Sequence, residues 1–275
     1  MKSVLFKLFA IILVLGFTKP EYETFQGKAI YFSKAKLELG RWGAKMSEMQ
    51  KKQIKARLKN RLEKEYVLTF NRKESFFKEE EKIDAISGAT DSWGKNFSPG
   101  DQYKNIQSNE LIQSLYFFVK RFLVIVLLHI FLWIIGWDSY FIGNYLCMKA
   151  TAFIPTKELT WYNFSWSDLR KTEQKKDSLG NTVESKIEMT EVEAWYTPQI
   201  PVSHGPAEYW GLPGLILEVS AGNQIMLCSK VIMNPKDKIE IEAPEKGKEI
   251  TKMAYQETIK GKMIEMRNNR GRRRR

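Results

Sequence analysis

Cysteine and histidine are scarce in this sequence, which has two of each in 275 residues. Two cysteines exclude a small fold that depends on many disulfides. The two histidines, His129 and His204, stand far apart, so the sequence gives no basis for a zinc or di-iron cluster. So few histidines also leave no Ser, His and Asp order from which a catalytic triad could be argued. We therefore expect no catalytic residue, no metal site and no cofactor.

A glycine loop for phosphate binding is also missing. The nearest pattern, Gly211-x-x-Gly214, contains Pro213 and precedes a strand-like segment rather than a helix. The acidic run Glu79–Glu81 is interpreted as a solvated surface. Lys and Arg number 44 against 32 acidic residues, and the resulting charge of +12 favours anionic partners in general terms.

The composition is that of a globular protein, with 43% hydrophobic and 28% charged residues. Residues 1–17 (MKSVLFKLFAIILVLGF) have a basic start and a short apolar stretch, as a secretory signal does. No small-x-small cleavage pattern follows, so a cleaved signal and a retained anchor both stay open. We expect export to the periplasm or cell envelope, and hence no nucleic-acid partner.

Apolar–polar alternation over 26–39 predicts a half-buried strand, and other short segments have similar patterns. The further predicted strands are 66–71, 75–83, 102–107, 110–119, 186–196, 214–221 and 223–234. A loop is predicted at 84–101 and an exposed hairpin tip at 165–182. The pattern is typical of one α+β, mainly β domain over 19–268, with a curved, half-barrel-like antiparallel sheet.

Two helices are predicted to accompany the sheet. Ser47 and Gln50 form a capping-box pattern at the start of a basic helix over about 48–64. Its apolar stripe consists of Met49, Ile54, Leu58 and Leu62. A second helix is predicted over 251–268, with Met253, Ile259, Met263 and Met266 near one face. The remaining residues, 269–275, are predicted to be a disordered tail in which Arg272, Arg273, Arg274 and Arg275 could contact an anionic membrane surface.

Residues 122–137 (FLVIVLLHIFLWIIGW) are the most apolar run after the N-terminus. As a helix they would reach about 24 Å, which is shorter than a bilayer core of about 30 Å. Two consecutive buried strands, with Gly136 near a bend, are the favoured interpretation. A membrane segment stays open as the alternative.

A turn followed by a buried strand is predicted at Gly211-Leu212-Pro213-Gly214-Leu215-Ile216. Pro213 and Gly214 suit the two central positions of a type II turn, in which the second residue has a positive φ. This hexapeptide resembles the signature of the GLPGLI family of exported bacterial proteins. The resemblance covers about 26–266 and is most specific over 194–218. It implies export into a Gram-negative envelope and no established enzymatic activity.

By that resemblance, 122–141 should be a strand pair with polar positions, whereas here those positions are apolar. Cys147 and Cys228 lie in strand-like segments and could pair in an oxidising periplasm, or stay separate buried thiols. Four aromatic residues could line the mouth of a ligand site or pack in the core: Trp195, Tyr196, Tyr209 and Trp210.

Two functions follow as hypotheses. The first is a non-enzymatic envelope protein that binds a hydrophobic or lipid-like ligand, or a partner protein, on a curved sheet. The second is a membrane-anchored structural or assembly protein that uses 1–17 or 122–137 as its anchor.

Overall fold

The computed structural model describes residues 25–37, 39, 43–80, 98–164, 166, 169 and 187–272. The predictions for 1–17 and for Arg273, Arg274 and Arg275 lie outside these residues. So does most of the predicted loop at 84–101 and of the hairpin tip at 165–182.

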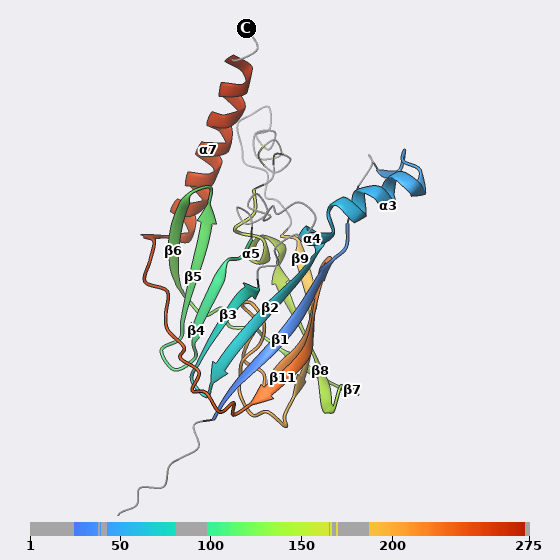
Figure 1. Ribbon diagram of the computed structural model, residues 1–275, viewed down its shortest axis with the longest axis vertical. Helices are drawn as coiled ribbons and strands as arrows, with labels where there is room; N and C mark the ends of the chain where they lie inside the picture. Colours follow the sequence, from blue (N-terminus) through green and yellow to red (C-terminus); the bar gives the residue numbers. More distant parts are fainter. Residues whose placement is uncertain are drawn as a thin grey trace, which may run out of the picture.

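A single 12-stranded sheet forms the body of the protein (Figure 1). Its order is β12-β6-β5-β4-β3-β2-β1-β11-β10-β9-β8-β7. The strands are β1 (Gln26–Ala35), β2 (Glu63–Asn71), β3 (Glu74–Glu80), β4 (Asp101–Asn105), β5 (Glu110–Phe117), β6 (Lys120–Leu127), β7 (Ile134–Ile142), β8 (Tyr145–Pro155), β9 (Met189–Thr197), β10 (Leu215–Ala221), β11 (Gln224–Met233) and β12 (Lys248–Ile250).

The predicted antiparallel pairing holds for all but one pair of neighbouring strands. β12 pairs with β6 in parallel, so the sheet is mixed. β12 is not held by a tight hairpin, because residues 234–247 separate it from β11. On the way, Ile241 and Ala243 pack against Tyr103, Ile112 and Leu123 on the outer side of the sheet.

The sheet is curved and open, as predicted, and its two ends approach each other. β6 and β7 follow one another in the chain but lie near opposite ends of the strand order. Residues 128–133 join them, and a connection this short spans at most about 20 Å. Two tryptophans fasten this connection: Trp133 Nε1 donates to Trp210 O at 2.9 Å, and Trp210 Nε1 donates to His129 O at 2.7 Å.

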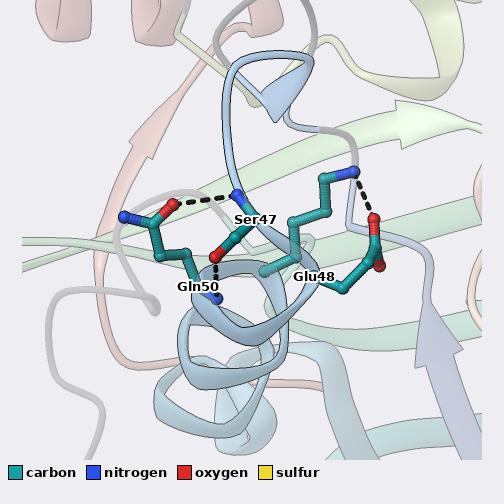
Figure 2. Close-up of polar contacts among 4 residues, drawn as sticks. Ser47, Glu48 and Gln50 are labelled. Carbon is teal, nitrogen blue, oxygen red and sulfur yellow. Dashed lines mark hydrogen bonds and ion pairs between the residues drawn. The ribbon is translucent and has the colours of Figure 1, made fainter.

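The predicted basic helix is present as α3 (Glu48–Arg57) and the short α4 (Lys59–Leu62). Ser47 and Gln50 form the predicted capping box (Figure 2). The predicted apolar stripe is only partly covered: Ile54 is half-buried, Met49 is 73% exposed, and no residue of α3 is buried. The helix projects away from the sheet instead of packing on it (Figure 1).

The C-terminal helix, α7 (Lys252–Arg272), packs by its first half and continues beyond residue 268. Tyr255, Ile259 and Met263 are buried together with Phe122 of β6 and Trp161. Met253 was predicted on this face but is exposed. The second half of α7 extends beyond the end of the sheet (Figure 1).

The main core lies on the inner side of the curved sheet, where the β9–β10 connection (198–214) packs. Ile200, Val202 and Leu212 of this connection are buried against strand residues such as Tyr31 and Phe70. The Tyr31 hydroxyl donates to Ile216 O at 2.6 Å, which ties β1 to β10 across the core. The family-like hexapeptide is therefore part of the fold's interior framework.

Glycine is needed in the hexapeptide for reasons that differ from the prediction. Gly211, not Gly214, has a positive φ, of 94°. A Cβ on Gly214 would lie 2.2 Å from Thr197 O, so this glycine permits close approach of the chain to the end of β9. The predicted type II turn with a positive φ at Gly214 is wrong.

Residues 122–137 form strand β6, a connection and the start of β7. No helix in the described part of the chain is long and apolar enough to cross a membrane. The strand prediction is correct, but the run is only partly buried, and its second half contains one buried residue, Phe131. Phe122, Leu123 and Val124 are buried, whereas Leu132 is 83% exposed and Trp137 is 99% exposed. β7 is an edge strand, so the sheet covers it on one side only.

Candidate ligand-binding cavities

Two neighbouring cavities lie inside the curve of the sheet, and they differ in how many of their lining residues are polar. The first, of about 520 Å³, lies where the two ends of the sheet approach each other. The second, of about 480 Å³, lies beside the β10–β11 turn. Both volumes are in the range that small-molecule sites in proteins occupy. We call them the apolar cavity and the polar cavity.

The apolar cavity is enclosed by β5, β6, β8, the 128–131 connection and the helical turn α5 (Thr156–Leu159). Most of its walls are aliphatic or aromatic: Leu111, Val126, Leu127, Leu128, Ile130, Phe131, Ile154, Leu159 and Trp161. Its polar groups come from Gln113, His129, Glu158, Glu208 and Lys252. Such a cavity can bury an apolar chain and place a few polar groups beside it.

The polar cavity has apolar lining residues as well, such as Pro99, Leu159 and Met226, but more of its lining residues carry hydroxyl, amide and carboxylate groups. These come from Gln102, Thr156, Thr160, Tyr162, Asn163, Glu188, Thr190, Glu208, Tyr209, Asn223 and Gln224. Among the described residues that line it there are two glutamates and no Lys, Arg or His.

Leu159 and Glu208 line both cavities and so form the boundary between them. Leu159 belongs to α5, which is held to the start of β9 by two bonds of Thr156. Its amide donates to Glu188 O at 2.9 Å, and its hydroxyl lies 2.8 Å from that of Thr190. Glu208 belongs to the β9–β10 connection.

A buried pair of glutamines on the sheet contributes one residue to each cavity. Gln102 of β4 and Gln113 of β5 are direct partners across the ladder, so their side chains share a face. Gln102 lines the polar cavity and Gln113 lines the apolar one. Gln102 Oε1 and Gln113 Nε2 have no hydrogen-bond partner among the described residues.

Lys104 fixes the backbone on both sides of Glu208. Its side chain is fully buried, and Nζ donates to Gly205 O at 2.7 Å, Ala207 O at 2.6 Å and Tyr209 O at 3.1 Å. Burial lowers the pKa of Lys104 to about 7, and the nearby Glu208 carboxylate opposes this fall. Three carbonyl acceptors require three N–H donors, which only the protonated ammonium supplies.

Glu208 has an unusual electrostatic environment at the boundary. Burial raises the pKa of its carboxyl to about 7; Lys252 and Lys104 act against this rise, and Glu158 adds to it. Lys252 forms an ion pair with Glu158 and lies over the Trp161 ring at 5.1 Å. The carboxyl can therefore exist in either protonation state near neutral pH.

His204 lies in the same connection but does not line either cavity. Burial lowers the pKa of its imidazole to about 3, and the Lys104 charge adds to the effect. It is therefore neutral at pH 7. No group of three or more His, Cys, Asp or Glu in the described residues is arranged to hold a metal ion.

Of the four aromatic residues considered for a ligand site, only Tyr209 lines one of these two cavities. Tyr196 is buried in the core, and Trp210 fastens the 128–133 connection. Trp195 lies on β9, where its Nε1 donates to Glu193 Oε1 at 2.9 Å and its ring packs edge-on against Tyr140. Of these three, Tyr196 is buried in the core, and Trp195 and Trp210 are half-buried and pack against it.

Cys147 and Cys228 are both free, buried thiols. They belong to β8 and β11, with β9 and β10 between them in the sheet. A disulfide needs Cα atoms within about 7 Å, whereas neighbouring strands are already about 4.8 Å apart. Each thiol donates to a carbonyl of its own strand, Cys147 Sγ to Tyr145 O and Cys228 Sγ to Lys230 O.

The residues that shape the cavities were largely missed in the sequence. Lys104 and Gln102 stand in a short polar strand that gave no sign of burial, and Gln113 stands in an ordinary strand pattern. Glu208 follows Ala207 in a loop, where a carboxylate normally faces water. In the sequence of the 198–214 connection, Gly205 and Pro206 are typical of a stiff loop but do not indicate a cavity.

Comparisons with known proteins give limited information. A family model described as "Protein of unknown function (Porph_ging)" matches residues 133–218, which include the hexapeptide, so the GLPGLI name stays a resemblance. No curated protein matches the chain. Two crystal structures of PNGF-II, in different space groups, are similar at 13% and 14% identity, with TM-scores of 0.48 and 0.47. The alignments cover 86% and 85% of this chain, which spans about a third (32%) of the length of PNGF-II.

Proposed function

We propose that this protein is a non-enzymatic binding protein for a hydrophobic, lipid-like ligand, and that it acts in the bacterial cell envelope. The observation that supports the proposal is the apolar cavity of about 520 Å³, which adjoins a polar cavity at Glu208. The envelope location rests on the signal-like residues 1–17.

The apolar cavity offers a large binding energy to an alkyl chain. Each buried methylene contributes about 0.8 kcal/mol, so a chain of about eight carbons gains roughly 6 kcal/mol before the costs of association. The walls are held in place by Trp133 and Trp210, which fix the 128–133 connection, and by the packing of Trp161 under α7. A largely preformed site of this kind avoids much of the ordering cost.

The test uses N-phenyl-1-naphthylamine, an uncharged apolar dye whose fluorescence rises in apolar sites. We expect saturable binding to the purified protein and a loss of at least about tenfold in affinity in Val126→Trp, which fills the apolar cavity. Ile125→Trp is the matched control, because Ile125 neighbours Val126 on the strand but is exposed and does not line the cavity. Equal affinity in both variants, with both folded by circular dichroism, would refute binding in this cavity.

A second candidate function, membrane attachment in a structural or assembly role, is favoured by a separate observation. Residues 127–137 carry no Asp, Glu, Lys or Arg, and Leu132 and Trp137 project almost fully into solvent. Leu127 and Ile130 are both exposed and part of the apolar cavity wall, so this surface adjoins the cavity. We propose that it contacts a lipid bilayer, with 1–17 as a further anchor if it is retained.

Flotation with phosphatidylethanolamine and phosphatidylglycerol vesicles tests this attachment. The double variant Leu132→Ser and Trp137→Ser should lose vesicle binding. The matched control is Val119→Ser, which removes a side chain that is 98% exposed in the distant β5–β6 turn. If the protein without residues 1–24 does not float, or the double variant floats as well as the control, the 127–137 surface is not a membrane contact.

A further inference from the structure

We infer that the polar cavity binds the head group of the ligand, and that this head group is rich in hydroxyl groups and carries no negative charge. The inference rests on the proposed function, since it assigns the second cavity to the same amphipathic ligand. It specifies which amphiphiles the protein accepts.

The two cavities are placed to bind one molecule. They share Leu159 and Glu208 as a boundary, so a ligand with its chain in the apolar cavity has its polar end beside Glu208. Without a ligand, water reaches the polar groups of this cavity, because Asn163, Glu188 and Asn223 are exposed. An apolar occupant would displace that water and leave polar groups without partners, which is costly, so these groups favour a polar occupant.

The glutamine pair at the boundary indicates what that occupant offers. Gln102 is 1% exposed and Gln113 is 2% exposed, and the first has an unpaired acceptor while the second has an unpaired donor. A buried polar atom without a partner costs about 1–3 kcal/mol. A hydroxyl group both donates and accepts, so it can pair with either amide once that side chain turns toward the cavity that it lines.

The remaining walls favour several hydroxyl groups rather than one. Tyr162 and Asn163 supply donors and acceptors, and the hydroxyls of Thr156, Thr160 and Thr190, which already bond within the protein, can still accept. Groups of this kind form direct bonds with sugar-like hydroxyls, because each partner can act as donor or acceptor.

Charge argues against a phosphate or carboxylate head group. Glu188 and Glu208 line the polar cavity, and its described lining includes no basic residue, although the chain as a whole carries a charge of +12. Lys104 lies close to Glu208, but its three N–H groups already bind backbone carbonyls. An anionic head group in the polar cavity would therefore meet two carboxylates, whereas the nearest described cations, Lys252 and Lys104, lie outside its lining.

The experiment compares three ligands with the same chain: octyl β-D-glucoside, octyl phosphate and 1-octanol. Each competes with N-phenyl-1-naphthylamine on the intact protein, below its micelle concentration. We expect the glucoside to bind at least about tenfold more tightly than either of the others, a difference of about 1.4 kcal/mol. Equal or tighter binding of octyl phosphate, or binding of octanol as tight as that of the glucoside, would overturn the inference.

Variants assign the discrimination to residues. Glu188→Gln combined with Glu208→Gln should improve octyl phosphate binding. The affinity for octyl β-D-glucoside should then exceed that for octyl phosphate by less than about threefold. The control is Glu191→Gln, because Glu191 lies on β9, is exposed and does not line the cavity. This variant should keep the affinity ratio of the wild type. Gln102→Leu should weaken glucoside binding and leave dye affinity unchanged.

Dye binding separates a failure of the head-group inference from a failure of the proposed function. If N-phenyl-1-naphthylamine binds and depends on Val126, but the three octyl ligands compete equally, the head-group inference fails and the proposed function stands. If the dye does not bind, the proposed function itself fails. Octyl phosphate binding that depends on Lys252, at the edge of the apolar cavity, would place an anionic head group there instead and refute the inference.

Discussion

Replacing Lys104 by methionine is expected to destabilise the protein by about 3 kcal/mol. The ammonium donates to three buried carbonyls, those of Gly205, Ala207 and Tyr209, at 2.6–3.1 Å. Methionine has a similar length but no donor, so three carbonyls would lose their partner. At about 1–3 kcal/mol for each unsatisfied group, the gross cost is roughly 3–9 kcal/mol. Methionine also avoids the cost of burying a charge, which is several kcal/mol. The net loss of stability is therefore near the lower end of this range.

Urea denaturation at pH 7, followed by tryptophan fluorescence, measures this change. The matched control is Lys78→Met on the neighbouring strand β3, where the lysine is exposed and the expected change is within about 0.5 kcal/mol. Loss of stability in Lys104→Met alone would support its role in holding the 205–209 segment. A variant as stable as the wild type, or more stable, would refute the reasoning, because it would mean that burying the charge costs as much as its three bonds return.

Three further predictions concern single groups. Gly214→Ala should destabilise the protein by about 2–4 kcal/mol in the same assay, because its Cβ would lie 2.2 Å from Thr197 O; an unchanged midpoint would contradict the close approach. Burial raises the pKa of Cys147 to about 11 and that of Cys228 to about 12, so both thiols should resist iodoacetamide until the protein unfolds, and a non-reducing intact mass should show no disulfide. Because the folded-state pKa of Glu208 is raised to about 7, its contribution to stability is present below about pH 4.5 and is lost as the pH rises through 7. The free energy of unfolding of Glu208→Gln, relative to that of the wild type, should therefore rise by about 2 kcal/mol between pH 5 and pH 8. If the difference between the two proteins is constant across this range, the carboxyl titrates normally.

Much of the fold was predictable because it depends on local patterns. Alternation located strands such as β1 and β2, and the capping box located the start of α3 at Ser47. These signals arise within a few residues and survive in the folded chain. The parallel pairing of β12 with β6 was not predictable in this way, because no local pattern sets the partner of a strand that follows a long connection.

The cavities depend on long-range contacts, so the sequence did not reveal them. Lys104 is buried because carbonyls about a hundred positions away converge on it. Tyr209 was named as a ligand-site aromatic and does line the polar cavity, whereas Trp210 is used to fasten the 128–133 connection. The apolar run was expected to be buried because of its composition. It is half exposed because β7 is the last strand of an open sheet.

The most direct test of ligand binding is an NMR measurement of contacts between octyl β-D-glucoside and isotope-labelled methyl groups of the protein. We expect intermolecular nuclear Overhauser effects from the octyl chain to Leu111, Val126 and Leu159, which line the apolar cavity. The exposed Ile125 methyls should show none. Contacts confined to exposed methyl groups, or no contacts at saturating ligand, would contradict the proposal that this cavity binds a lipid-like molecule.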